Sequence, residues 1–554
     1  MKFMKLGTSV DTFYTEDNNI RTLDCAVPSD LIVHINNTSY HLHQYALLPK
    51  CGVLQEIFVD GGDSSSLSIE LHDVPGGEEA FELCAKFCYG IQIRLSAENF
   101  VLAYCAAKFL RMTEVQEKGN LILKLESFFE SCVLEGWKDS IVALKSTLKV
   151  PDSSEQLGLT GRFIDSIVDK ILVPPPKVMW SFTYSRSGYE RRQQAVPMDW
   201  WTEDLSCLDA ELFRSVIVSV RSTSILLPQL IGEALHVYAS CNLLPKTAST
   251  KSPQSSTSGA NLSFEAKKQM LESIASLIPL DRGSVSVRFL LRLLSLAHQL
   301  EMSSSTKTEL TRRCSAQLGD ATVDDLLLVS SSSTDQDFYD IEPVKAVLGN
   351  YLTLYRRLLA SHPEDKTKVS GSFQKVGKLI DSLLQIVASD VSLPVSDFIS
   401  LAKLLPKIAR PDHDELYKAI NIYLKEHPNL PKPDKKSLCS ILDCERLSHE
   451  VAAQAVKNDL LPLRTVVQVL FFEQERASRA KPPKSKTTSG SSDRRQNSSQ
   501  GKSSNSPAAD HRQDLTIAVA DIRPRKDEGS ASRRNRTTQQ KTHLKNAIKK
   551  ILDC

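Results

Sequence analysis

Hydrophobic and polar positions alternate near the start of the chain in a way that predicts a small region of strands and helices. Residues 30–35 (DLIVHI) and 40–43 (YHLH) flank the turn-forming residues NNTS, which predicts a β-hairpin. Residues 67–71 (LSIEL) place their apolar side chains on one face of a further strand. Apolar positions at helical spacing in 75–90 and 97–110 predict two helices. Strands followed by helices indicate an α+β domain.

The pattern changes in residues 120–476, where apolar positions recur with the helical period almost throughout. Residues 285–300 (VSVRFLLRLLSLAHQL) are the strongest case. Further helices are predicted at 208–221, 341–360, 373–387, 396–406, 413–426 and 462–476. Two Ser/Thr-rich stretches, 246–263 and 330–337, interrupt this pattern and predict mobile loops.

Both ends of the chain are polar. From Ala477 to the C-terminus the chain carries 18 Lys and Arg against 7 Asp and Glu, whereas the remaining 476 residues carry 50 against 59. Such a basic segment with few apolar residues predicts disorder, although helical spacing returns at 542–554. We therefore predict a flexible lead-in at 1–25, an α+β domain at 26–128, a helical linker region at 129–196, a large all-α domain at 197–476 and a disordered basic tail at 477–554.

Overall composition narrows the class of protein further. Charged residues make up 24% and hydrophobic residues 41% of the 554 residues, which is typical of a soluble protein with two or three domains. The start of the chain lacks the apolar run of a secretory signal, and no apolar stretch is long enough to span a membrane. We therefore expect a cytoplasmic protein whose 12 cysteines are mostly reduced thiols.

The segment 438–448 (LCSILDCERLS) is the strongest candidate for a metal site. Cys439 and Cys444 lie five positions apart, with His427 upstream and His449 directly downstream. Structural zinc sites usually pair a C-x₂₋₄-C motif with a second pair of ligands, which is absent here. On one continuous helix, residues five apart point about 140° away from each other. We therefore predict no metal ion, and cysteines that pack a helix–turn–helix joint.

No catalytic motif is present in the chain. We find no nucleophile elbow, no zinc-protease helix and no phosphate-binding loop. We therefore predict a non-enzymatic protein that needs no cofactor. The basic tail has almost no aromatic residue on which a base could stack, so we expect no specific nucleic-acid binding.

The tail nevertheless suggests a second kind of partner. Residues 542–554 combine an apolar stripe with lysines, which suits an anionic membrane surface. Ser478, Ser498 and Ser499 lie near basic clusters, and their phosphorylation would weaken such contact. Tyr417 is a further candidate phosphorylation site, with helix packing as the alternative role of its side chain.

Several blocks of the sequence resemble one plant family. The segments SDLIVHI, YHLHQYALLPKCGVL and PGGEEAFELCAKFCYG resemble a BTB/POZ domain, in the version found in the phototropic-response family typified by nonphototropic hypocotyl 3 and root phototropism 2. Further segments are similar to successive blocks of the helical domain of that family, namely DWWTEDLSCLDAELFRSVI, VSVRFLLRLL, ARPDHDELYKAINIYLKEHPNL and LCSILDCERLS with LPLRTVVQVLFFEQ. The resemblance covers residues 25–476 in the order of the family.

The resemblance implies a substrate adaptor of a cullin-3 RING ubiquitin ligase. The BTB domain would dimerise and bind cullin-3, and the helical domain would recruit a client protein for ubiquitination. The alternative that the resemblance implies is an oligomeric scaffold that gathers phototropin-like receptor kinases at the plasma membrane and has no ligase role. We expect a cytoplasmic protein whose basic tail makes peripheral contact with the plasma membrane.

The resemblance also points to two residues at the dimer interface. Many BTB domains pair an aspartate of the first strand with a Lys or Arg that follows the histidine of the second strand. In this chain the aspartate is Asp30, and Gln44 occupies the position of the cation. Many cullin-3 binders also carry a hydrophobic-x-Glu element, which residues 58–66 (FVDGGDSSS) lack.

Overall fold

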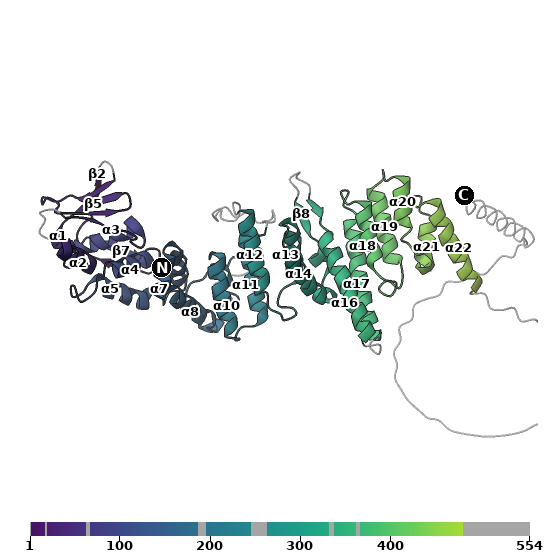
Figure 1. The fold of residues 1–554 in the computed structure, drawn as a ribbon. Helices are drawn as coiled ribbons and strands as arrows, with labels where there is room; N and C mark the ends of the chain where they lie inside the picture. The colour runs from purple at the N-terminus through teal and green to yellow at the C-terminus, as the bar shows by residue number, and fades with distance from the viewer. Residues whose placement is uncertain are drawn as a thin grey trace, which may run out of the picture. The chain divides into compact units, whose positions relative to one another are not determined.

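The computed structural model describes residues 2–16, 19–61, 67–186, 195–244, 263–331, 337–361 and 366–479. The described part is mostly helical, and the ribbon shows its strands gathered mainly in the N-terminal region (Figure 1). The chain divides into two compact units, Met1–Leu379 and Ile380 onward, so that the boundary falls inside the predicted all-α domain.

A five-stranded sheet forms the centre of the N-terminal region, with the strand order β2-β3-β5-β4-β6. Its strands are β2 (Phe13–Glu16), β3 (Ile20–Leu23), β4 (Leu31–Ile35), β5 (Thr38–Leu42) and β6 (Leu67–Glu70). Strands β4 and β5 form the predicted hairpin, which is confirmed, and Ile35 pairs with Thr38 beside the turn. Leu31, Val33 and Ile35 are fully buried because alternate residues of a strand face the same side.

The first 25 residues differ from our expectation. They form β1 (Phe3–Leu6), β2 and β3, so the prediction of a flexible lead-in is wrong. Strand β1 pairs antiparallel with β7 (Ile93–Ser96), and β3 pairs parallel with β5. The local sequence could not show this, because these strands are four residues long and several of their partners lie far along the chain.

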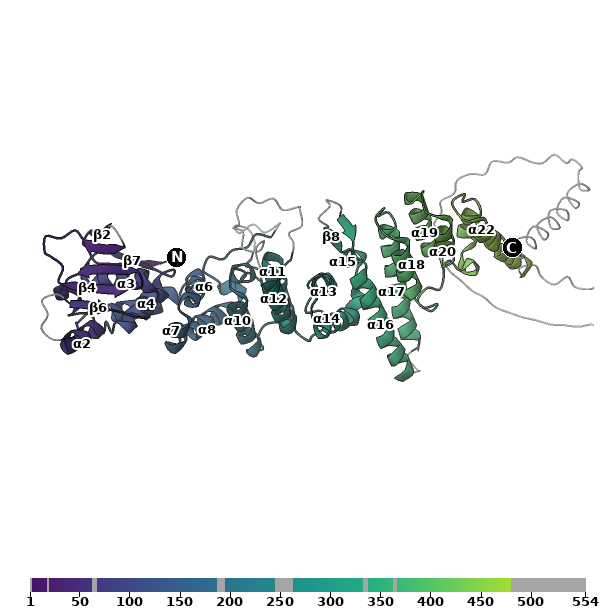
Figure 2. The same ribbon diagram turned by 45° about the horizontal axis from the view of Figure 1, so that its top comes forward.

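Helices lie against one side of the sheet and continue beyond it (Figure 2). They are α1 (Gln44–Leu47), α2 (Gly52–Gly61), α3 (Gly77–Cys88), α4 (Phe100–Phe109) and α5 (Leu121–Phe128), followed by a π-helical turn at Phe129–Val133. The two predicted helices are confirmed as α3 and α4. Gly90, at a φ of 69°, follows the end of α3 in the left-handed conformation that glycine adopts without strain.

The remainder of the first unit is built almost wholly of helices. They are α6 (Trp137–Ser146), α7 (Pro151–Gln156), α8 (Leu159–Ile171), α9 (Thr202–Leu205), α10 (Ala210–Ser222), α11 (Pro228–Asn242), α12 (Phe264–Leu277), α13 (Val287–Gln299), α14 (Ser304–Gln317), α15 (Val323–Leu326) and α16 (Glu342–Ser361). Short 3₁₀ turns occupy Thr147–Lys149, Pro175–Lys177 and Leu318–Asp320. Side-chain caps fix several helix starts; for example, Asp209 accepts a hydrogen bond from the Glu211 amide, and Ser286 accepts one from the Phe289 amide.

Two local features stand out in this helical region, a short pair of strands and a close contact at a glycine. Strands β8 (Val329–Ser331) and β9 (Asp337–Tyr339) form an antiparallel pair where we predicted only a mobile loop. Gly232 of α11 lies against the chain at Ser284, so closely that a β-carbon there would be 1.7 Å from the Ser284 carbonyl oxygen. Any larger residue would therefore push these two segments apart.

The second unit begins inside α17 (Lys366–Val387). It continues through α18 (Val395–Leu404), α19 (Asp414–Glu426), α20 (Lys432–Cys439), a 3₁₀ turn (Cys444–Arg446), α21 (His449–Val456) and α22 (Leu463–Arg479). The helices predicted from the pattern are confirmed, with boundaries that shift by up to seven residues. Helix α22 extends three residues past the predicted start of the tail, and the rest of the tail lies outside the described residues.

Candidate functional site

Asp30 and Gln44 do meet, as the resemblance implied. Gln44 is the first residue of α1, and its backbone amide donates a 2.8 Å hydrogen bond to a carboxylate oxygen of Asp30. The side-chain amide of Gln44 donates a second bond, of 3.0 Å, to the Asp30 carbonyl oxygen. A helix N-terminus carries unpaired amides and a partial positive charge, so it partly replaces the missing cation. Whether the two residues form a dimer interface stays a prediction.

His43, the residue before Gln44, is buried beside the same corner of the domain. It is 3% exposed, and its Nε2 lies 3.0 Å from the Val27 carbonyl oxygen. Because a carbonyl can only accept, Nε2 carries the proton, and Nδ1 accepts from the Tyr89 hydroxyl at 3.0 Å. Burial raises the pKa of Tyr89, which keeps this hydroxyl protonated. Tyr45 and Val27 remain 63% and 52% exposed, so this corner presents apolar side chains to the outside.

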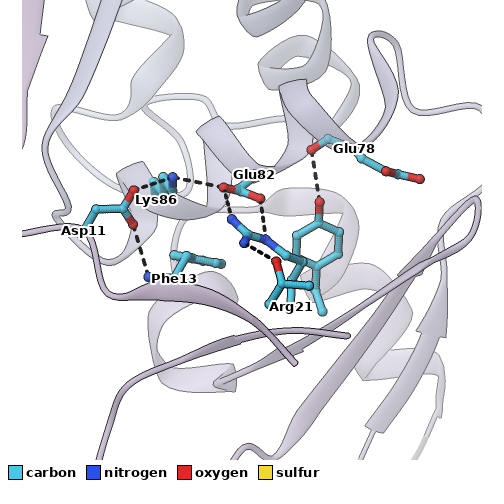
Figure 3. A network of polar contacts seen from close by, with 8 residues as sticks. Asp11, Phe13, Arg21, Glu78, Glu82 and Lys86 are labelled. Carbon is cyan, nitrogen blue, oxygen red and sulfur yellow. Dashed lines mark hydrogen bonds and ion pairs between the residues drawn. The ribbon is translucent and has the colours of Figure 1, made fainter. Parts of the chain in front are cut away.

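A polar hollow of about 600 Å³ lies between the β2–β3 hairpin and α3. At its base the Arg21 guanidinium donates two hydrogen bonds to the Glu82 carboxylate, of 2.9 and 2.5 Å. The Lys86 ammonium lies 2.9 Å from Glu82 and 2.6 Å from Asp11. Figure 3 shows Glu82 between the two cations, with Asp11 beyond Lys86. This network fastens the first residues of the chain to α3.

The charges of the hollow neutralise one another. Burial opposes the ionisation of Glu82, but the hydrogen bonds from Arg21 and Lys86 outweigh it and lower the pKa of this carboxyl. The Tyr40 hydroxyl donates to the Glu78 carbonyl oxygen at 3.2 Å. The lining residues include no Ser, Cys or His beside a base, so the hollow offers polar contacts and no activated nucleophile.

A second cluster lies in the second unit and centres on Arg410 of the block ARPDHDELY. The Arg410 guanidinium donates to both carboxylate oxygens of Asp381, with distances of 2.5 to 3.1 Å, and to the Ala402 carbonyl oxygen at 3.0 Å. Only 7% of each charged side chain is exposed. Burial raises the pKa of Asp381 despite the neighbouring Arg410. The pair fixes α17 and α18 to the loop that precedes α19.

The loop that precedes α19 also makes hydrogen bonds with the segment that follows α20. The Asp443 amide donates to His413 Nδ1 at 3.0 Å, and the Arg446 guanidinium donates to the Arg410 carbonyl oxygen at 3.0 Å. Burial, assisted by the positive charge of Arg410, lowers the pKa of His413 to about 4. The ring is therefore neutral at pH 7 and accepts the bond that positions Asp443.

Comparison with known proteins decides the family. The chain is 53% identical to the BTB/POZ domain-containing protein At5g47800 of Arabidopsis thaliana, over 88% of this chain and 87% of that protein. The model of the NPH3 family matches residues 199–452. The chain belongs to the NPH3 family of plant BTB/POZ proteins. Two further Arabidopsis thaliana members, the phototropic-responsive NPH3 family proteins NPY2 and NPY1, are 37% and 36% identical over 86% of this chain, and over 77% and 82% of their own lengths.

The search of solved structures found no significant match. The family match includes Arg410, His413, Asp443 and Arg446, so the second cluster lies within the NPH3 region, as does its partner Asp381.

The cysteine block of the NPH3-family chain packs as a joint between helices. Cys439 ends α20 and Cys444 begins the 3₁₀ turn, and both are 4% exposed. Burial raises the pKa of each thiol to about 11. Ser448 caps α21 by accepting a bond from the Val451 amide, as its position in the sequence predicts.

The two histidines near this block have other partners. His427 stacks on Tyr423 with ring centroids 3.8 Å apart, and the exposed His449 lies 2.5 Å from the Glu473 carboxylate. Among the residues that the structure describes, no three metal-ligating side chains are grouped to hold an ion. No described helix is long and apolar enough to cross a membrane.

The candidate phosphorylation sites fall into three situations. Tyr417 is 3% exposed and accepts a hydrogen bond from the Asn458 amide group, so the structure favours packing and gives a kinase no access in this fold. Ser478 is exposed on α22, where its hydroxyl donates to the Gln474 carbonyl oxygen at 2.8 Å. Ser498 and Ser499 lie outside the described residues.

Sequence reasoning missed the ion pairs that organise both clusters. Arg21, Glu82 and Asp381 carry no local motif, and each finds its partner 29 or more residues away. The one available signal was Arg410 within the block ARPDHDELY, where a charged residue stands beside apolar and proline positions.

Proposed function

We propose that this protein is a non-enzymatic substrate adaptor of a cullin-3 RING ubiquitin ligase. Its N-terminal BTB/POZ region dimerises and binds cullin-3, and its helical NPH3 region recruits a client protein for ubiquitination. Membership of the NPH3 family supports the adaptor class. The geometry contributes one observation: the corner around Asp30 and Gln44 is rigidly hydrogen-bonded and presents exposed apolar side chains.

That corner suits an interface between two copies of the chain. Tyr45, 63% exposed, has its ring 5.4 Å from His43 and 6.5 Å from Tyr89, so its position is fixed before a partner arrives. Aromatic side chains held in this way contribute strongly to association, because little conformational entropy is lost on binding. A symmetric dimer would bring the same patch of each copy together.

The decisive experiment compares the full chain with its Tyr45→Glu variant. We expect the wild type to be dimeric by light scattering, and we expect Tyr45→Glu to weaken the dimer at least about tenfold, because it places a charge in an apolar contact. Val391→Glu is a matched control, since Val391 is 70% exposed and belongs to the second unit. A monomeric wild type, or equal effects of both variants, would exclude this interface.

A pull-down separates the adaptor from the other function that the family suggests. Retention of cullin-3 by the dimeric full chain supports the adaptor. A dimer that retains a receptor kinase and no cullin-3 would instead identify a signalling scaffold at the plasma membrane. We place the protein in the cytoplasm with its basic tail on the inner leaflet, which binding to anionic vesicles before and after removal of residues 480–554 would test.

A further inference from the structure

The four tryptophans of the chain gather at one junction of the first unit. Trp137 begins α6, Trp200 and Trp201 precede α9, and Trp180 lies in the segment between them. The ring centroid of Trp200 lies 4.6 Å from that of Trp137 and 5.7 Å from that of Trp180. Trp137, Trp200 and Trp201 are each at most 1% exposed.

An extended segment, residues 178–186, packs its own Trp180 and Phe182 against Trp200, and we call it the strap. Phe182 of the strap is 6% exposed, with its ring 5.6 Å from Trp200. The strap has no helix or strand of its own from Val178 onward, so its position depends on bonds to other segments. Those bonds come mainly from carboxylates.

Two carboxylates hold the backbone of the strap. The Thr183 amide donates a 3.0 Å hydrogen bond to Asp204, which also accepts a 2.7 Å bond from the Trp137 indole nitrogen. The Ser185 amide donates to both oxygens of Glu203, each at 2.9 Å. Both acids lie on the short helix α9, whose sequence places them side by side.

The end of the strap is held through its arginine. The Arg186 guanidinium lies 2.6 Å from Asp199 and 2.8 Å from Glu233 of α11. Arg186 is thereby committed to two acids. Asp199 and Glu233 offset the positive charge that Arg186 places beside Ser185.

Ser181, Thr183 and Ser185 are the exposed serine and threonine residues of the strap, and Thr183 and Ser185, whose amides are both held by carboxylates, differ in whether a cation contacts the hydroxyl. Thr183 Oγ accepts a 2.9 Å hydrogen bond from the Lys138 ammonium, so added negative charge there would gain a cation. Ser185 is also exposed, but no described residue bonds its hydroxyl. The Glu203 carboxylate already occupies the Ser185 amide, so added negative charge at Ser185 would face a like charge.

We propose that Ser185 is a phosphorylation site whose modification releases the strap from the tryptophan cluster. A protein kinase would transfer the γ-phosphoryl group of ATP to Ser185 Oγ, which forms one P–O bond and breaks the bond to the β-phosphate. ADP leaves, and the hydroxyl proton passes to the base of the kinase. The resulting phosphate carries nearly two negative charges, which repel Glu203 and break the hydrogen bonds to the strap amide.

The first experiment measures the release. Because all four tryptophans lie at this junction, acrylamide quenching of the tryptophan fluorescence of the full chain reports on the strap. Phosphoserine genetically encoded at position 185, or Ser185→Glu, should raise the opening equilibrium and amide exchange of the strap about tenfold. Ser185→Gln has the same shape without charge and should change neither, and Thr183→Glu should leave the strap closed beside Lys138.

Several results would overturn the proposal. Equal quenching in Ser185→Glu and Ser185→Gln would show that charge is not responsible. Opening by Thr183→Glu as large as that by Ser185→Glu would show that Glu203 has no special role. Circular dichroism of each variant distinguishes release from unfolding.

The second experiment asks whether the site is used. The protein is purified from the cells that make it, and its phosphopeptides are mapped by mass spectrometry. We expect phosphate on Ser185. Recovery of the peptide that contains residues 178–186 without phosphate on Ser185, under all signalling conditions tried, would refute the modification itself.

Discussion

The N-terminal hollow and the cluster of the second unit use the same chemistry in different surroundings. Arg21 and Glu82 are 23% and 19% exposed, whereas Arg410 and Asp381 are each 7% exposed. Both arginines make two-pronged contacts with a carboxylate. The pKa of Glu82 is nevertheless lowered and that of Asp381 raised.

Solvation explains the difference. Glu82 keeps access to water and has two cations, Arg21 and Lys86, so the attraction exceeds the cost of partial burial. Asp381 has one cation and little water, so the cost of burial exceeds the attraction of Arg410. The partly exposed network therefore fastens β2 and β3 to α3 with modest energy. The buried pair mainly fixes one arrangement of α17, α18 and the following loop, and its loss would be severe.

The largest expected effect follows from removing one partner of the buried pair. Arg410→Met should lower the free energy of unfolding of the second unit by about 3–5 kcal/mol, because Asp381 is left buried without a cation. Chemical denaturation of the full chain, followed by hydrogen exchange in α17 and α19, measures it. The double variant Arg410→Met, Asp381→Leu should recover much of the loss. A single variant as stable as the wild type would show that the pair is not buried in solution.

Removing the charge of Glu82 from the N-terminal network should lower the stability less. Glu82→Gln keeps the shape of the side chain and removes the charge that Arg21 and Lys86 share, at an expected cost of about 1–2 kcal/mol. The effect should appear as faster amide exchange in β2 and β3, because the network fastens them to α3. Glu79→Gln is a matched control, since Glu79 is an exposed neighbour on the same helix. A loss as large as that of Arg410→Met would remove the distinction between the two regions.

The two regions were also unequally predictable from the sequence. The β4–β5 hairpin and helices such as α13 follow from local periodicity, because each residue's face is set by its near neighbours. Strands β1 to β3 were not predicted, because each is only four residues long and because β1 and β3 pair with strands farther along the chain. One sequence block, ARPDHDELY, contains Arg410 and His413 of the second cluster. No block indicated that Asp381 pairs with Arg410.

The glutamine that stands in place of a cation beside Asp30 shows a further limit of sequence-based prediction. The resemblance placed Gln44 opposite Asp30, and the structure brings them together. It could not show that a backbone amide at the start of α1 takes over from the absent cation, because a sequence comparison contains no information on main-chain donors. Ser185 was missed for a similar reason. Glu203 accepts hydrogen bonds from its backbone amide, and the sequence does not show such main-chain contacts.

The smallest expected effect depends on pH and separates His413 from its charged neighbours. The pKa of His413 is lowered to about 4 in the folded protein, below the ordinary value of 6.5. Between these values the unfolded chain binds more protons, so stability is complete above about pH 6.5 and falls as the pH decreases toward 4. After discounting for the part of the ring that water reaches, we expect a loss of about 1 kcal/mol.

His413→Asn is the informative variant, because its side-chain oxygen can still accept from the Asp443 amide while it cannot be protonated. Denaturation midpoints of wild type and variant should agree at pH 7.5 and diverge toward pH 5, with the wild type less stable. Carboxylates common to both proteins, Asp381 among them, cancel in this difference. Parallel curves would mean that His413 titrates normally and that the ring is not buried against Arg410. The surroundings of His413 in the second cluster would then be as open to water as the N-terminal network. The contrast between the two regions would then rest on Asp381 alone.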